Sequence, residues 1–301
     1  MAECEAVNSR ERRRTEGTRE QRDMAEPKRP LELYGMRTSV PAPVADTHQC
    51  PFRKAKCVKQ RKSDSSKTIG TCIVGAEGKP QLICPIRMRE TDQVFTDVAY
   101  LLTGAIAEVM VIPEIKLGEL GNVDFLVVGL DGKGNVVDFL GLELQTNDTT
   151  GSGPLYDARN DFFAGRLQPS YKYGLNWKMT AKLVLKQTLD KSAVFMSWQK
   201  RYVWAMQDTL LDRMRGYADM SGFSQANPAV HEVFFHAYEV VAGEHRYKLR
   251  LKERVGADLE GVAQANAAPL TIKAEILDGL QLLLREQTKR QTRGFRFGVS
   301  G

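Results

Sequence analysis

Three polar side chains, Asp124, Glu143 and Gln145, interrupt two apolar segments near the middle of this 301-residue chain. The segments, residues 123–130 and 136–146, have the alternation and β-branched content of strands. The turn-forming sequence DGKGN between them predicts a β-hairpin. Polar groups of these types on otherwise apolar strands are candidates for a metal site.

The expected pairing of this hairpin brings two carboxylates together. If the hairpin closes with Asp131 opposite Val136, Asp124 lies directly opposite Glu143 and shares a face with it. Gln145 follows Glu143 by two residues and projects from the same face. Three leucines point the other way, toward a core: Leu140, Leu142 and Leu144. Adjacent carboxylates are costly unless a cation neutralises them, so a divalent metal site is predicted. Polar residues on a solvated sheet face are the alternative interpretation.

Four cysteines precede the hairpin, in the motifs CPFRKAKC, GTCIVG and ICPIR. Cys50, Cys57, Cys72 and Cys84 fall within 35 residues, and four thiolates can close a tetrahedral shell around zinc or iron. Buried free cysteines that pack as small apolar residues are the alternative. The fifth cysteine, Cys4, lies in a charged N-terminal segment and is not assigned to this site.

Composition limits the possible functions. The chain is 42% hydrophobic and 27% charged, which is ordinary for a globular protein of one or two domains. No apolar run approaches the roughly 18 to 20 residues of a membrane span, and the N-terminus has no secretory segment, so a cytoplasmic location is expected. No G-x-x-x-x-G-K-[ST], G-x-S-x-G or H-E-x-x-H motif is present, which argues against an NTPase, a serine hydrolase and a metalloprotease.

Positive charge is concentrated between the cysteines. Residues 53–67 contain seven basic side chains and one acidic side chain, a surplus equal to the +6 of the whole chain. Residues 284–301 form a second, smaller basic segment. Local positive charge suits the phosphates of DNA, although solvated loops are the alternative. The predicted DNA contacts are Arg53, Lys54, Lys56, Lys59, Arg61 and Lys62.

The order of these motifs resembles one known family. The motifs CPF, CVK, GTCIV and ICPIR, followed by GEL, VDF and LELQT-x-D, are similar in order and spacing to the NotI restriction endonuclease family. The similarity runs from about residue 31 to the C-terminus and is strongest over residues 50–151. It implies a PD-(D/E)xK nuclease core joined to a small cysteine-ligated metal subdomain, with iron as the metal of the family.

The resemblance also implies roles for single residues. The four cysteines would ligate iron or zinc. Asp124, Glu143 and Gln145 would form the catalytic set with Mg²⁺, and the family itself has glutamine where most such nucleases have lysine. Glu119, in the motif GEL, matches a further acidic position, for which Glu114 is a weaker substitute.

The activity implied is that of a Type II restriction enzyme that cuts double-stranded DNA at a GC-rich palindrome. A homodimer and a separately encoded companion methyltransferase would accompany it. Two alternatives use the same residues: a cysteine-metal DNA-binding protein that no longer cuts, and a nuclease directed by the structure or modification of DNA.

The remaining pattern predicts an α/β (mixed α+β) fold. We expect a disordered tail over residues 1–30, the cysteine subdomain over 31–89 and the nuclease domain over 90–301. Helices are predicted at 90–110, 177–191, 209–217 and 269–289, and strands at 201–206, 232–240 and 247–254. The lysines of the helix over 177–191, including Lys191, are predicted to face solvent.

Overall fold

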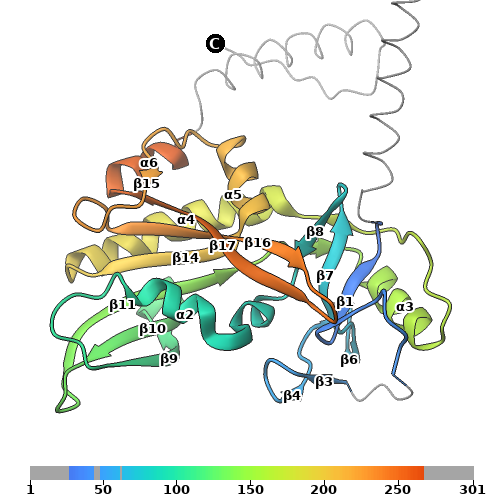
Figure 1. Cartoon of the computed structure of the whole chain (residues 1–301). Coiled ribbons are helices and arrows are strands. Elements are labelled where there is room, and N and C mark those ends of the chain that lie inside the picture. The colour runs from blue at the N-terminus through green and yellow to red at the C-terminus, as the bar shows by residue number, and fades with distance from the viewer. Residues whose placement is uncertain (1–26, 44–47, 62, 268–301) are drawn as a thin grey trace, which may run out of the picture.

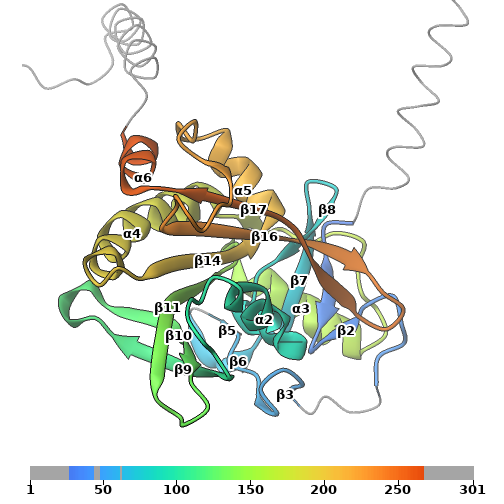
Figure 2. The ribbon, with the colours of Figure 1, turned by 60° about the vertical axis from the view of Figure 1, so that its left-hand side comes forward.

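A computed structural model describes residues 27–43, 48–61 and 63–267. Most of the predicted tail, Lys62, the second basic segment and the helix predicted over 269–289 lie outside the described residues. Mixed α/β architecture is confirmed, because a seven-stranded sheet is covered by helices (Figures 1 and 2). None of the described helices has both the length and the apolarity needed to span a membrane.

The large sheet has the order β15-β17-β16-β14-β11-β10-β9. Its strands are β9 (Glu108–Lys116), β10 (Asn122–Leu130), β11 (Val136–Gln145), β14 (Arg201–Gln207), β15 (Ser224–Gln225), β16 (Val233–Ala242) and β17 (Tyr247–Ala257). Strand β10 pairs antiparallel with both β9 and β11, whereas β11, β14 and β16 run parallel to one another. The helix α4 (Trp177–Ser197) makes the crossover between β11 and β14. The predicted strands over 201–206, 232–240 and 247–254 are confirmed as β14, β16 and β17.

The hairpin of β10 and β11 has the expected register along most of its length. Phe125 pairs with Leu142 and Gly129 with Asp138, as the sequence predicted. A bulge then shifts the pairing by one residue, so Leu130 faces Val136. The prediction that Asp131 lies opposite Val136 is therefore wrong by one residue. Asp131 folds over its own loop, where its carboxylate accepts hydrogen bonds from the backbone N–H groups of residues 133 and 135.

Each face of the large sheet carries its own core. One face packs against α4, α5 (Asp208–Arg215) and α6 (Leu259–Asn266). The other face packs against α2 (Gln93–Ala99) and the 3₁₀ turn Pro85–Asp92 that precedes it. Figure 2 shows α2 on one side of the strands and α4 on the other.

The helix predicted over residues 90–110 is wrong beyond residue 99. The apolar positions at 94 and 98 do lie on α2, but Leu101 and Leu102 are buried in the turn that follows it. Val109 belongs instead to the edge strand β9, which continues through Pro113. An edge strand tolerates proline because one of its N–H rows has no partner strand.

The cysteines lie in a smaller β-rich part of the molecule. Its sheet has the order β2-β1-β7-β8, from β1 (Pro30–Leu33), β2 (Met36–Arg37), β7 (Thr71–Ala76) and β8 (Lys79–Leu82). Two short hairpins, β3 (Gln49–Cys50) with β4 (Ala55–Lys56) and β5 (Gln60–Arg61) with β6 (Asp64–Thr68), complete it. The helix α3 (Ser152–Phe163), which follows β11 and β12 (Thr149–Thr150), also packs here, as does the segment around β13 (Gly174–Leu175).

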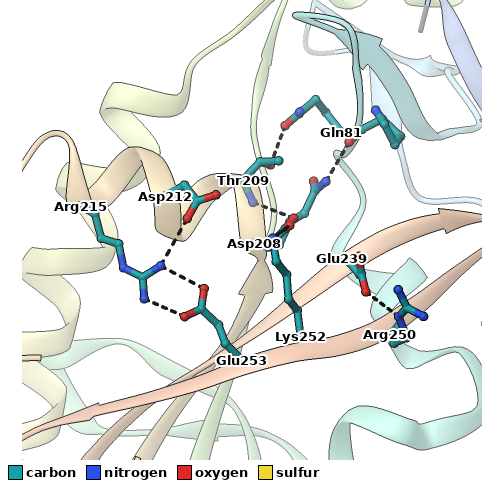
Figure 3. Close-up of polar contacts among 11 residues, drawn as sticks. Gln81, Asp208, Thr209, Asp212, Arg215, Glu239, Arg250, Lys252 and Glu253 are labelled. Carbon is teal, nitrogen blue, oxygen red and sulfur yellow. Dashed lines mark hydrogen bonds and ion pairs between the residues drawn. The ribbon is translucent and has the colours of Figure 1, made fainter. Parts of the chain in front are cut away.

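A polar seam joins the small sheet to the C-terminal ends of the parallel strands. The Gln207 amide accepts a hydrogen bond from the Leu82 N–H (2.7 Å) and donates one to the Pro80 carbonyl (2.8 Å). Beside it, the Thr209 hydroxyl donates to the Gln81 amide oxygen (2.9 Å), and Figure 3 shows this contact near the Asp208–Lys252 ion pair. The seam fixes β8 against β14.

A buried ion pair joins the small sheet to β17. The Arg87 Nε lies 2.6 Å from Glu32 Oε1, and both side chains are fully buried. The Tyr247 N–H donates to the other Glu32 oxygen (2.9 Å), and Arg87 donates in turn to the Tyr247 carbonyl. Burying these charges is tolerated because each has hydrogen-bonding partners.

Candidate active site

Asp124 and Glu143 lie where β10 and β11 separate. Regular pairing of the two strands ends at Phe125 and Leu142. One residue further, Asp124 accepts a hydrogen bond from the Leu144 backbone N–H (2.9 Å) through its side-chain oxygen Oδ2. The side chain thus takes the bond that a regular ladder would give to a backbone carbonyl, which holds one carboxylate at the opening of the fork.

Glu143 stands on the face of β11 that packs against α4. Its side chain is only 6% exposed. Burial, together with the negative charge of Asp124, raises the pKa of this carboxyl to about 7, although hydrogen bonds from Lys191 and Tyr202 oppose the shift. The negative charge of Asp124 thus acts on the Glu143 carboxyl, because the structure brings these two predicted residues close together.

Both neighbours of Glu143 contact the same carboxylate oxygen. The Lys191 ammonium lies 2.5 Å from Oε1, and the Tyr202 hydroxyl donates to Oε1 over 2.9 Å. Lys191 also donates to the Asn122 carbonyl at the start of β10 (2.7 Å). Among the described residues, Oε2 of Glu143 has no recorded hydrogen-bond partner.

The prediction that Lys191 faces solvent is wrong. Its side chain is 5% exposed, because it lies on the face of α4 that packs on the sheet. The spacing of the lysines contains the signal that was missed. Lys178, Lys182 and Lys186 recur every four residues and stay close to one face, whereas the step of five to Lys191 turns it by roughly 140° around the helix.

Within the described part of the chain, neither Gln145 nor Glu119 forms a hydrogen bond with Asp124 or Glu143. The Gln145 amide donates to the neighbouring Thr146 carbonyl (2.7 Å). Glu119 is exposed in the short 3₁₀ turn Gly118–Leu120, between β9 and β10. Glu114, the weaker substitute, lines the same surface hollow as Asp124.

The hollow beside Asp124 is bordered by two arginines. Arg53 comes from the turn between β3 and β4, and Arg89 comes from the 3₁₀ turn before α2. The Arg89 guanidinium lies over the Phe125 ring, 5.4 Å from its centroid. Cations that line a hollow beside a carboxylate suit the phosphate of a phosphodiester, and Arg89 was not among the predicted DNA contacts.

The other predicted DNA contacts divide into two kinds. Lys54 and Lys56 are exposed, whereas Lys59 donates to the Ile83 carbonyl (2.7 Å) beside the cysteines. Arg61 is half-buried, packs near Gly153 at the start of α3, and has a buried Nε without a recorded partner. Lys59 therefore uses its ammonium group inside the cysteine-containing part of the molecule, whereas Arg61 packs beside the start of α3.

All four predicted cysteine ligands are buried and reduced. Burial, together with the neighbouring Cys84 and Cys50, raises the pKa of the Cys57 thiol to about 11. Burial, reinforced by neighbouring cysteines, also raises the pKa of Cys72 and Cys84. The four thiols therefore lie close enough to influence one another.

The donor atoms of both sites match the predicted metals in type. Carboxylate oxygens suit Mg²⁺, and sulfur donors suit zinc or iron. Among residues 27–43, 48–61 and 63–267, however, no three His, Cys, Asp or Glu side chains are grouped tightly enough to hold an ion. The match rests on the type of donor and on the partner-free Oε2 of Glu143.

Comparison with known protein families identifies the family of this chain. A family model described as "Restriction endonuclease NotI" matches residues 36–249, more than two thirds of the chain. The matched region contains the four cysteines, the fork of β10 and β11, and the whole of α4. No curated protein matches the chain.

Proposed function

Because this chain belongs to the NotI restriction endonuclease family, we propose that it is a Type II enzyme in which Asp124 and Glu143 hold Mg²⁺ for hydrolysis of double-stranded DNA. Membership of this family implies that the chain is a site-specific DNA endonuclease. The single observation that carries the residue assignment is the fork, where two carboxylates meet on otherwise apolar strands and the charge of one reaches the other.

The order of elements supports a PD-(D/E)xK core. The series α2, β9, β10, β11, α4 and β14 forms a helix, an antiparallel meander and a crossover helix that leads to a parallel strand. The candidate carboxylates fall on the second and third strands of that series. We place the nuclease domain on this core, and the cysteine subdomain, with zinc or iron on Cys50, Cys57, Cys72 and Cys84, beside it.

The residues of the site have different roles in hydrolysis. When bound, a divalent cation activates water and neutralises charge on the phosphate. Glu143 offers Oε2 to the cation, since Lys191 and Tyr202 hold Oε1 in place. Asp124 is fixed by the Leu144 N–H and offers its second oxygen. Arg53 and Arg89 bind phosphate oxygens at the rim of the hollow.

We also propose that two copies of this chain act as a homodimer. A palindromic site presents the same phosphodiester on both strands, and a two-fold symmetric pair of chains is the simplest way to cut each once. A separately encoded methyltransferase would protect the same sequence in the host, and a GC-rich target follows the family.

The experiment is cleavage of large, sequence-diverse DNA with and without Mg²⁺. We expect discrete fragments from the wild type and intact DNA from Glu143→Gln and Asp124→Asn, which should still retard DNA. Glu108→Gln is the matched control. Glu108, on β9, pairs with Leu130 of β10, which lies six residues from Asp124, a distance of roughly 20 Å. Cleavage by either site variant would refute the assignment, whereas DNA retardation without any Mg²⁺-dependent cleavage by the wild type would favour the non-cleaving alternative. Cleavage confined to branched, nicked or modified DNA would favour the third possibility.

A further inference from the structure

We propose that Lys191 is a positioning residue of the endonuclease site, and that it supplies from α4 the positive charge that position 145 lacks. The proposal rests on the function proposed above, because it assigns Glu143 to the metal. It adds a residue on a different element, 48 positions further along the chain.

The ammonium group of Lys191 spans the fork. It contacts Glu143 Oε1 on β11 at 2.5 Å and the Asn122 carbonyl at the start of β10 at 2.7 Å. A single cation therefore ties together the two strands that carry the candidate ligands. Together with the Tyr202 hydroxyl, it fixes one carboxylate oxygen of Glu143 and leaves the other for an ion.

Close packing of α4 on the sheet places this lysine. Gly141, two residues before Glu143 and on the same face, has no side chain, and an added Cβ would lie 2.5 Å from the Phe195 ring of α4. The missing side chain lets the helix approach β11, and Lys191 lies one turn before Phe195 on the same buried face. A longer residue at position 141 would hold the helix and its ammonium group away.

At the fork itself, Lys191 offsets part of the negative charge of the two carboxylates. Asp124 and Glu143 contribute two negative charges and Lys191 one positive charge, so a divalent ion would bring the total to +1. That total complements the single negative charge of a phosphodiester. Gln145 cannot contribute to this balance, because its amide is neutral and is bonded to the Thr146 carbonyl.

The test removes the charge and then restores it on the neighbouring strand. Lys191→Gln keeps a hydrogen-bond donor but loses the charge, and Lys191→Met keeps the length of the side chain only. Gln145→Lys, combined with either, returns an ammonium to the face of β11 that carries Glu143. Lys186→Gln is the control, since Lys186 lies on the same helix, is 74% exposed and pairs only with Asp190.

Single-turnover cleavage in Mg²⁺ and DNA affinity in Ca²⁺ are measured for each folded variant. We expect Lys191→Gln and Lys191→Met to cleave about 100-fold or more slowly, with DNA affinity within about threefold of the wild type. We expect Gln145→Lys to restore at least about tenfold of the lost rate. If Lys191 had only a structural role on α4, an ammonium group on β11 would not restore cleavage.

Several outcomes would overturn the proposal. Cleavage within about threefold of the wild type by either folded Lys191 variant would do so. So would loss of cleavage that Gln145→Lys leaves unchanged in both backgrounds. If the wild type cuts and Glu143→Gln does not, these results refute the role of Lys191 alone. If the wild type cuts no DNA, the proposed function fails and this inference fails with it.

Discussion

The buried carboxyl of Glu143 predicts how stability depends on pH in protein without added divalent metal. Burial and Asp124 raise its pKa from 4.5 to about 7 in the folded chain, so the folded state retains a proton that the unfolded state has lost. The stabilising contribution of this group is fully present below about pH 4.5 and is lost as pH rises through about 7.

The perturbation is Glu143→Gln, which keeps the shape and an acceptor oxygen but does not titrate. A difference of about 2.5 pKa units corresponds to about 3 kcal/mol, of which about 2 to 3 kcal/mol falls between about pH 5 and pH 8. We therefore expect the variant to gain this amount of stability over the wild type across that interval. The comparison cancels groups common to both proteins, such as His236, whose pKa is lowered by burial to about 3.

Urea unfolding of both proteins at several pH values, in buffers freed of divalent metal, measures this difference. Glu108→Gln serves as the control, because this exposed carboxyl should leave the shape of the curve unchanged. Parallel curves for the wild type and Glu143→Gln would refute the reasoning. They would show that the pKa of Glu143 is close to its ordinary value and that the charge of Asp124 does not reach it.

Three further predictions concern packing, the buried ion pair and DNA. Arg87→Met leaves a buried carboxylate without its cation and should lower the unfolding free energy by about 3–5 kcal/mol, whereas Arg250→Met, on the surface, should leave the urea midpoint unchanged. Gly141→Ala should cost about 1–3 kcal/mol in the same assay, because its Cβ would meet a ring of α4, and Gly132→Ala, with open space around it, should cost far less. Arg53→Ala should weaken DNA retardation and lower the slope of log affinity against log salt by about one, and an unchanged slope would remove it from the DNA surface.

The hairpin could be predicted from sequence because its signals are local. Alternation predicts which side chains share a face, and the turn sequence limits the register, so the residues alone predicted Asp124 beside Glu143. In the structure, regular pairing ends one residue before them, at Phe125 and Leu142. The bulge near Val136 could not be predicted, because it depends on how the loop aspartate folds back. Helix α2, the turn after it and the start of β9 were mistaken for one helix, because Leu101 and Leu102, buried in the turn, extended the apolar stripe.

The residues that surround Glu143 could not be predicted from local sequence patterns. Which face of α4 is buried depends on Gly141, some fifty residues earlier, and on the side chains of β14. Tyr202 reaches Glu143 only because β11 and β14 pair in parallel through a long crossover. Likewise, the contact of α3 with the cysteine sheet joins segments that no periodicity connects.

The partners of Glu32 have a consequence for synthesis on the ribosome. Glu32 lies in β1, the first strand of the described residues, and its cation and backbone donor come 55 and 215 residues later. A nascent chain therefore has to expose most of its length before this carboxylate can be buried with its partners. The cysteine sheet cannot settle early as an independent unit. Chains released before Tyr247 would still pair Glu32 with Arg87 but would lack the backbone N–H that donates to the second Glu32 oxygen.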